Sequence, residues 1–596
     1  MKGIQGQRGI AKGIISSIMG IFSALAMGNA QAAERVNLRM GPFQQEIPVQ
    51  ALAHYAETGD VPPSLDLLKP LLTPKVQALL TRRLALDEEV VNRLIRGSLG
   101  TRELEPLMEQ LQTALPEADS VALMAALYLA FQDGDGLSAI DFIQAYPEET
   151  LTIDATATMA LGVQLNLSYL HSQLLAPILE QTLKPEFPNS FRPPFDPTAS
   201  GNNSFQERTL IFRDHQRDRS IMADFYLPNT SSGPLVVLSH GYASNRQFLT
   251  YLARHLASHG LTVVALEHPG SNLEILSDTE FPLNPGKLLS PQELVHRPQD
   301  IRFLLDELSQ FNNNSQFFQP LNTENVTVIG HSLGGYTALA LAGGELDLKA
   351  VRRFCRQVKP LGRSPADWLQ CAAAKLSHST LSLRDSRITR AIALNPMTSQ
   401  LFGEDGLKQV KIPTLIFSSS KDAVTPALTN QLQPFTELSG EKYLLAAIGA
   451  THLSVTDIRN VNSPMGKNSL IPELMGQKAK PVRDWIRAAT LAFIKQEPPQ
   501  ARQYEPFLTP EYAQLISTPK LSFRLTQEMP RRLMPWLQGI NWSRKQLLAR
   551  ENPGRDRSSQ AQIEFNFPNL WTKPATHQYC QGQLQEIFTD LSRRLG

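Results

Sequence analysis

The sequence predicts an α/β protein with a mostly parallel sheet, preceded by a smaller, mainly helical domain. Two patterns lead to this prediction. Between residues 204 and 500, short apolar and β-branched runs alternate with helical segments, which is typical of a parallel sheet with helices on both faces. Between residues 49 and 145, apolar residues recur every three or four positions, which indicates helices with one buried face. With 596 residues, the chain is long enough for both domains.

The charge balance gives no reason to expect a nucleic-acid partner, because 57 basic and 56 acidic residues nearly cancel. No glycine-rich phosphate loop follows a predicted strand, and the three cysteines do not have the spacing of a zinc site. No tight carboxylate cluster suggests a cation. We therefore expect neither a metal nor another cofactor, and the sequence does not indicate an oligomeric state.

Residues 1–32 have the three parts of a secretory signal. Lys2, Arg8 and Lys12 precede an apolar stretch at residues 14–27, and Ala30-Gln31-Ala32 has the small-residue pattern of a cleavage site. We expect cleavage after Ala32 and export to the periplasm or the extracellular space. The alternative is that the segment is kept as an uncleaved anchor.

Residues 33–183 are predicted to form the smaller accessory domain. Alternation over residues 36–48 favours a hairpin or short extended pieces, and a helical pattern runs from residue 49 to about residue 145. A further helix is expected within residues 157–183. No cluster of reactive side chains is found in this domain. It either packs against another surface or caps the mouth of a functional site, and both interpretations stay open.

A proline-rich linker, residues 184–203, leads to the main domain, residues 204–500. The strands expected there span residues 208–214, 220–227, 235–238, 261–268, 326–329, 388–394, 412–417 and 443–448. Helices are expected at residues 248–259, 298–311, 333–342 and 481–496. Residues 345–387 are an insertion, and residues 501–596 form a C-terminal extension to which we assign no catalytic role.

The motif Gly330-His331-Ser332-Leu333-Gly334 lies between an expected strand and an expected helix. This G-x-S-x-G pattern is typical of a nucleophile elbow, in which a sharp turn presents a serine hydroxyl above the sheet. The glycines are needed because a side chain at either position would collide with the neighbouring strand or helix. Ser332 is therefore the candidate nucleophile. The alternative is a glycine-rich turn with a purely structural role.

A serine hydroxyl needs a base within hydrogen-bond reach, and the base needs an acceptor that fixes its tautomer. With this type of elbow, the acid and then the histidine follow the serine along the chain. Asp422 and His452 come in that order, each after an expected strand. The carboxyl ends of such strands are where open α/β sheets bind ligands. We therefore predict that Ser332, Asp422 and His452 form a catalytic triad.

Each of these assignments has alternatives. Asp405 and Asp457 are competing acids, but neither follows a strand in the expected place. His268 also follows a strand but precedes the serine, and His331 lies inside the elbow and is expected to point away from the serine. Asp422 itself could be a turn residue.

Stabilising a tetrahedral intermediate requires two N–H donors aimed at the developing oxyanion. The turn His240-Gly241-Tyr242 comes shortly after the expected strand 235–238 and matches the His-Gly type of turn that supplies one donor. We expect the backbone N–H groups of Tyr242 and Leu333 to form this oxyanion hole. His240 is expected to have a structural role.

Cys355 and Cys371 both lie in the insertion, 16 residues apart, and Cys580 lies in the C-terminal extension. Export would permit a disulfide. We predict a Cys355–Cys371 bond that staples a lid above Ser332. The alternative is that both are buried free cysteines.

Residues 208–457 resemble the α/β-hydrolase group that contains predicted dienelactone hydrolases and plasma-type platelet-activating-factor acetylhydrolases. The resemblance rests on the segments 235–241, 255–268 and 328–335. It implies an α/β-hydrolase fold with Tyr242 and Leu333 in the oxyanion hole. Residues 35 to about 160 resemble an uncharacterised helical domain fused to such hydrolases in cyanobacteria. Unlike the acetylhydrolases, this chain has the insertion and the long extension. True dienelactone hydrolases use a cysteine where this chain has Ser332.

Taken together, these features predict an exported serine hydrolase that cleaves carboxylic esters of small molecules or lipids through an acyl-enzyme. A thioesterase, amidase or peptidase with the same triad is one alternative. A non-catalytic binding protein on a hydrolase scaffold is another. A membrane-surface lipase is a third, although the sequence shows no clear basic amphipathic helix to support membrane binding.

Overall fold

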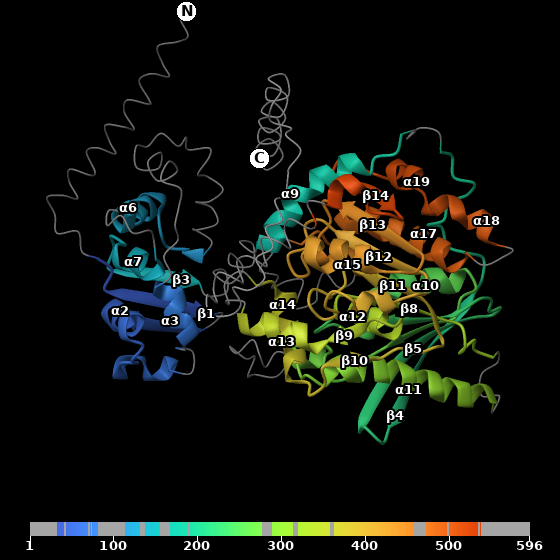
Figure 1. Cartoon of the computed structure of the whole chain (residues 1–596), viewed down its shortest axis with the longest axis horizontal. Coiled ribbons are helices and arrows are strands. Elements are labelled where there is room, and N and C mark those ends of the chain that lie inside the picture. Colours follow the sequence, from blue (N-terminus) through green and yellow to red (C-terminus); the bar gives the residue numbers. More distant parts are fainter. Residues whose placement is uncertain are drawn as a thin grey trace, which may run out of the picture. The chain divides into compact units, whose positions relative to one another are not determined.

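The computed structural model of the chain (Figure 1) describes most of both predicted domains. The described residues are 32–40, 43–69, 72, 74–81, 114–131, 138–154, 167–186, 191–276, 289–313, 320–357, 363–457, 473–496, 500–534 and 537. The chain divides into two units, residues 1–540 and 541–596, and the second lies outside the described range. The predicted signal, up to residue 31, and Cys580 also lie outside it.

The N-terminal domain combines a small sheet with helices around a core of its own. Strand β1 (Arg35–Met40) pairs antiparallel with β2 (Phe43–Pro48), which confirms the predicted hairpin, and pairs in parallel with β3 (Thr150–Asp154). The helices are α2 (Val49–Thr58), η1 (Pro63–Leu68), α3 (Pro74–Thr81), α6 (Ser120–Phe131) and α7 (Ala139–Gln144). Their apolar side chains form one cluster with residues of β1, β2 and β3. The domain thus has a three-stranded sheet beside its helices, because β3, which the sequence analysis missed, pairs with the predicted hairpin.

The main domain is built on a nine-stranded sheet with the strand order β14-β13-β12-β11-β8-β6-β7-β5-β4. The strands are β4 (Phe205–Asp214), β5 (Arg219–Pro228), β6 (Leu235–Ser239), β7 (Val263–Leu266), β8 (Val326–His331), β11 (Ile388–Leu394), β12 (Thr414–Ser419), β13 (Lys442–Ile448) and β14 (Ser522–Thr526). Neighbours from β7 through β13 pair in parallel. Strands β4, β5 and β14 run antiparallel to the strands beside them. This confirms the mostly parallel sheet.

Helices cover both faces of the sheet, which explains why its central strands read as continuous apolar runs. Every residue of β6, β7, β8 and β12 is buried. On one face, alternate strand residues pack with α10 (Thr250–Ser258) and α17 (Lys480–Ile494). On the other face, the intervening residues pack with α11 (Glu293–Asn313) and α12 (Leu333–Leu341). Burial on both faces is the usual arrangement for parallel strands.

The helix α9 (Leu167–Thr182) packs on the main domain, whereas the sequence analysis had placed it in the accessory domain. Leu175, Leu179 and Leu183 join the core cluster that contains α12 and the insertion. Figure 1 shows α9 alongside β13 and β14, with which it is in contact. The linker prolines suggested a boundary near residue 184, but the apolar face of α9 lies before that linker and belongs to the larger core.

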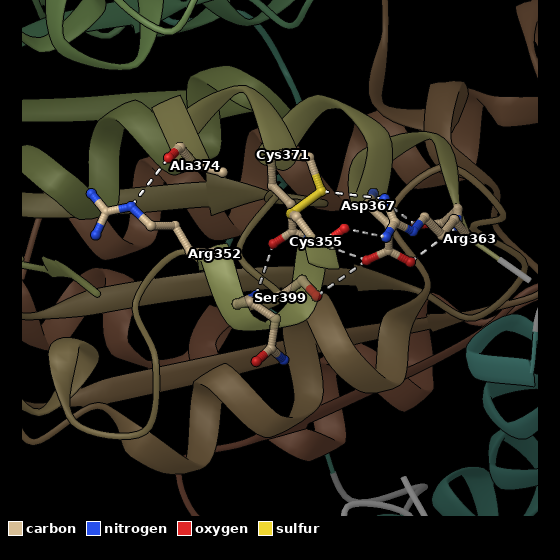
Figure 2. The surroundings of a disulfide bond; sticks show 10 residues. Arg352, Cys355, Arg363, Asp367, Cys371, Ala374 and Ser399 are labelled. Atoms are coloured by element: carbon tan, nitrogen blue, oxygen red, sulfur yellow. Dashed lines mark hydrogen bonds between the residues drawn. A yellow bond between two sulfur atoms is a disulfide. The ribbon is translucent and has the colours of Figure 1, made fainter. Parts of the chain in front are cut away.

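The insertion consists of a two-stranded sheet, β9 (Glu345–Asp347) with β10 (Thr380–Ser382), and the helices α13 (Leu348–Gln357), α14 (Pro365–Gln370) and η5 (Cys371–Lys375). The predicted disulfide is present: Cys355 in α13 is bonded to Cys371, with their Cα atoms 5.7 Å apart (Figure 2). The guanidinium of Arg363 lies beside this bond and donates to the Cys371 sulfur at 3.4 Å.

Within the described ranges, no helix combines the length and the apolar character needed to cross a membrane.

Candidate active site

Ser332 occupies a sharp turn between β8 and α12. Its φ of 55° and ψ of −116° are unusual for a residue with a side chain, which is the strain expected of a nucleophile elbow. The motif glycines make this turn possible. A Cβ added at Gly330 would lie 1.9 Å from the carbonyl oxygen of Gly334, and one added at Gly334 would lie 2.0 Å from that of Ser239. The G-x-S-x-G pattern thus reflects the close approach of the backbone on both sides of the serine.

Asp422 and His452 form a buried hydrogen-bonded pair. Nδ1 of His452 donates to Oδ2 of Asp422 at 2.7 Å, and both side chains are almost completely buried. The other carboxylate oxygen accepts from the backbone N–H groups of Val424 at 2.9 Å and Thr425 at 2.7 Å. With a proton on Nδ1, Nε2 of His452 is the ring nitrogen that can accept a proton.

The pKa of His452 reflects two opposing influences. Burial lowers it, but the charge and the hydrogen bond of Asp422, together with the charge of Glu473, outweigh burial, so the pKa lies above its ordinary value. This is the electrostatic setting of a general base whose protonated form is stabilised by a carboxylate.

The backbone around the serine and that around the histidine are joined by direct contacts. Nε2 of His331, the residue before Ser332, donates to the carbonyl oxygen of His452 at 3.0 Å, and the two imidazole centroids are 4.5 Å apart. Asn395 also donates to that carbonyl, at 3.1 Å. The residue before it, Leu394, accepts from the N–H of Ser332 at 3.0 Å. The structure therefore pairs two of the predicted triad side chains, Asp422 and His452, and joins the backbone at His452 to the residue before Ser332.

The competing residues have other partners. Asp405 forms an ion pair with Lys408 at 2.6 Å, and Asp457 accepts from the N–H of Tyr251 at 2.9 Å. Nδ1 of His268 donates to Asp300 at 3.0 Å. These contacts provide a structural role for each alternative acid and for the alternative histidine.

Glu473 is a further carboxylate near His452, and the sequence analysis missed it. Its Oε2 accepts from the N–H of Leu453 at 2.8 Å. Burial raises the pKa of Glu473 to about 7, and its charge helps to raise the pKa of His452. The phenol of Tyr169, on α9, is close enough to both Asp422 and Glu473 for their charges to add to the effect of burial in raising its pKa. Neither residue follows a strand, so no local pattern could identify them.

The turn after β6 packs directly against the nucleophile. A Cβ added at Gly241 would lie 3.3 Å from the Cβ of Ser332, so a larger residue would crowd the serine. Leu333 is the first residue of α12, and its N–H therefore has no acceptor within the helix. The phenol of Tyr242 is half-buried, and burial raises its pKa to about 12. Both predicted oxyanion donors thus lie in backbone segments that adjoin Ser332.

The imidazole of His240 fixes the peptide that carries the Tyr242 N–H. Nδ1 of His240 donates to the carbonyl oxygen of Gly241 at 2.7 Å, and Nε2 accepts from the N–H of His268 at 2.9 Å. In a trans peptide, the C=O of Gly241 and the N–H of Tyr242 point in opposite directions. Holding that C=O therefore sets the direction of the N–H. This contact supports the structural role expected for His240.

No group of three or more histidine, cysteine or acidic side chains suited to a metal ion occurs in the described part of the chain.

Comparison with known proteins adds two family matches. Residues 32–154 match the family described as "Alpha/beta hydrolase of unknown function (DUF1400)", and residues 234–347 match the α/β hydrolase fold family. The first match covers the N-terminal domain, and the second runs from the start of β6 through the elbow to the end of β9.

A curated relative is described as "Putative phospholipase A2" from Schizosaccharomyces pombe (strain 972 / ATCC 24843). It is 25% identical over 162 residues, which cover 20% of this chain and 37% of the relative. The match therefore spans well under half of that protein. With the nine-stranded sheet and the strand–elbow–helix unit, the comparisons show that the chain has the α/β-hydrolase fold.

Proposed function

We propose that this protein is a serine hydrolase that cleaves carboxylic esters through an acyl-enzyme. The observation that carries the proposal is the joint arrangement of Ser332 at a strained elbow and the buried His452–Asp422 pair, with 2.7 Å between Nδ1 and Oδ2. A serine, a histidine and a carboxylate in these roles are what acyl transfer requires.

In the proposed mechanism, Nε2 of His452 takes the proton from Ser332 as Oγ attacks the ester carbonyl carbon. The negative charge that develops on the carbonyl oxygen is stabilised by the N–H groups of Tyr242 and Leu333. Asp422 stabilises the imidazolium, which then gives its proton to the departing alcohol. A water molecule, activated by the same histidine, attacks the acyl-enzyme and releases the acid and the free serine.

We infer that the substrates are esters with an apolar acyl group, such as lipid esters. The similarity to a protein described as a putative phospholipase A2 supports this class. The insertion and α9 both contribute buried apolar side chains to one core cluster. Both also contact the segment around Asp422: the N–H of Ala366 in α14 donates to the carbonyl of Val424 at 3.1 Å, and Gln173 in α9 donates to the carbonyl of Ser420 at 2.5 Å. A thioester or an amide would need the same triad, so a substrate panel must separate these classes.

We also propose that the protein is exported. The Cys355–Cys371 bond suits an oxidising compartment, and residues 1–32 have the pattern of a secretory signal. N-terminal sequencing of the mature protein would test this, with a first residue of Ala33 as the expected result.

The decisive experiment is labelling with a fluorophosphonate, followed by hydrolysis of aryl esters of increasing acyl length. Ser332→Ala should abolish labelling and lower ester turnover by several orders of magnitude without loss of folding. Ser377→Ala, which changes an exposed serine in the insertion, is the matched control and should behave as the wild type. Full labelling of the Ser332→Ala variant would show that the nucleophile lies elsewhere.

A further inference from the structure

We propose that Arg297 is a positioning residue for the turn His240-Gly241-Tyr242, which we call the oxyanion turn. Arg297 holds this turn in the geometry that the proposed reaction requires. The inference rests on the proposed function. Arg297 lies in α11 and its side chain is completely buried. It donates to the carbonyl oxygen of His240, at the start of the oxyanion turn. It also donates to the hydroxyl oxygens of Ser271 at 2.8 Å and Thr337 at 3.3 Å.

These partners belong to three separate segments around the candidate site. His240 begins the turn after β6, Ser271 lies in the loop after β7, and Thr337 is in α12, which starts from the elbow. Nη2 of Arg297 also reaches the hydroxyl of Ser239, the last residue of β6, at 3.4 Å. One guanidinium therefore ties the oxyanion turn to the helix that carries the second oxyanion donor.

The surroundings of Arg297 do not suggest a role in stability alone. Among the described residues, its hydrogen-bond partners are one carbonyl and three hydroxyl oxygens. The carboxylates of Glu293 and Asp300 act on Arg297 through their charges but pair with Arg219, at 2.7 and 2.9 Å. Burial lowers the pKa of Arg297 to about 10, so it stays charged at neutral pH. A buried cation with mainly neutral partners is expensive to desolvate. A neutral residue of similar shape would avoid this cost. We therefore attribute the presence of a cation here to the geometry that its hydrogen bonds impose on the turn at residues 240–242.

A chain of hydrogen bonds links the cation to the donor peptide. Arg297 holds the carbonyl of His240, and the imidazole of His240 holds the carbonyl of Gly241 at 2.7 Å. The N–H of His268 donates to the other side of that imidazole, and the hydroxyl of Ser239 donates to Nε2 of His268 at 2.9 Å. Burial keeps the pKa of both histidines well below the ordinary value, so both are neutral. The peptide between Gly241 and Tyr242 is thus held before substrate arrives, as an oxyanion donor requires.

The test uses the full-length protein with a p-nitrophenyl ester as substrate, and kcat is calculated per fluorophosphonate-titrated site. Arg297→Met keeps the approximate length of the side chain but removes the charge and the donors. We expect kcat per site to fall about 10–100-fold, with KM changed less than about threefold, because the loss affects the transition state. Arg297→Lys should recover part of kcat. A purely structural role would lower the titrated fraction and leave kcat per site unchanged.

Two further variants keep the proposal falsifiable if Arg297→Met fails to fold. Ser271→Ala removes one partner and leaves the cation, and we expect kcat per site to fall a few-fold. Arg302→Met changes a partly exposed arginine five residues further along α11 and should leave kcat unchanged. Unchanged kcat per site in Arg297→Met, or in Ser271→Ala when the former does not fold, would overturn the inference. Wild-type protein that neither labels nor cleaves any ester would instead overturn the proposed function.

Discussion

At the scale of single residues, the candidate site is defined by how the protein environment adjusts two ionisable groups. His452 is buried and yet has a raised pKa, because Asp422 lies 2.7 Å from its Nδ1. Glu473 is a carboxylate whose pKa burial raises to about 7. Each group leads to its own prediction about how activity or stability depends on pH.

We predict that Asp422→Asn lowers kcat by about 10³–10⁴-fold and moves the acid limb of the kcat/KM profile to lower pH. The base must be neutral to accept the serine proton, so activity falls as pH drops through the pKa of His452. Removing the carboxylate charge lowers that pKa. The pH dependence of residual ester hydrolysis would show the shift, and an acid limb that moves to higher pH would contradict the assignment of Asp422.

Glu473→Gln should shift the same acid limb to lower pH by a smaller amount, since the charge of Glu473 also raises the pKa of His452.

The Glu473→Gln variant should also change stability in a pH-dependent way. Because the folded pKa of Glu473 is raised, its contribution to stability is present below the ordinary glutamate pKa and is lost as pH rises toward about 7. Between pH 4 and pH 8, the free energy of unfolding of the Gln variant should therefore rise relative to that of the wild type by up to roughly 3 kcal/mol. Equal differences in Tm at both pH values would contradict this.

The predictability of the site differs from residue to residue. Ser332, Asp422 and His452 could be proposed from sequence because each follows an apolar strand in a fixed order. The hydrogen bond between Asp422 and His452 agrees with that proposal. Glu473 and Arg297 could not, because both act through contacts between segments distant in sequence. A glutamate in an irregular segment and an arginine in a helix have no local pattern that marks burial.

At the scale of secondary-structure elements, the strands and helices of the main domain were found largely from apolar periodicity, but their assignment to domains was not. The helix α9 was expected in the accessory domain, and it packs on the main domain instead. Periodicity shows that a helix has an apolar face, whereas only the fold shows which surface that face covers. Strand β3 was missed because its five residues are too short to stand out.

We expect Leu179→Ala to destabilise the main domain by about 2–4 kcal/mol, because the α9 leucine is 3% exposed and its removal leaves a cavity. The neighbouring contact of Gln173 with the carbonyl of Ser420, two residues before Asp422, should transmit part of the effect to the site. Denaturant unfolding measures the first effect and ester kinetics the second. Leu515→Ala, at a leucine that is 47% exposed, should change stability by less than about 0.5 kcal/mol. Equal effects of the two substitutions would contradict the assignment of α9 to this core.

The disulfide gives a prediction for the insertion. Removal of the Cys355–Cys371 bond by the double substitution to serine should lower stability by roughly 3 kcal/mol, as expected for a loop of this length. If the insertion forms a lid, KM for long acyl chains should change more than KM for acetate esters. Thermal melting and the ester series test both parts. Equal KM changes for all chain lengths would leave the bond a structural role only.

At the scale of the whole molecule, the accessory and main domains have hydrophobic cores of their own. The N-terminal core is formed by described apolar residues between Ala33 and Leu151, and the sheet of β1, β2 and β3 is separate from the nine-stranded sheet. The match of the N-terminal region to a family described as an α/β hydrolase therefore falls on a region whose described strands belong to a different sheet. The chemistry proposed here is located entirely in the main domain.

The C-terminal extension has a consequence for how the protein behaves in solution. Strand β14 pairs antiparallel with β13, the strand that leads to His452, and so takes the place of β13 as the outermost strand at this end of the sheet. The sequence analysis gave the extension no such part. Removing residues 522–596 should expose the backbone N–H and C=O groups of β13, which offer a template for strand pairing between molecules. We predict concentration-dependent aggregation, measurable by light scattering, whereas removal of residues 541–596 alone should leave the protein monodisperse. The extension would thus limit self-association by keeping the backbone groups of β13 paired. Proteolysis within β14 would remove that pairing and make the protein prone to aggregate.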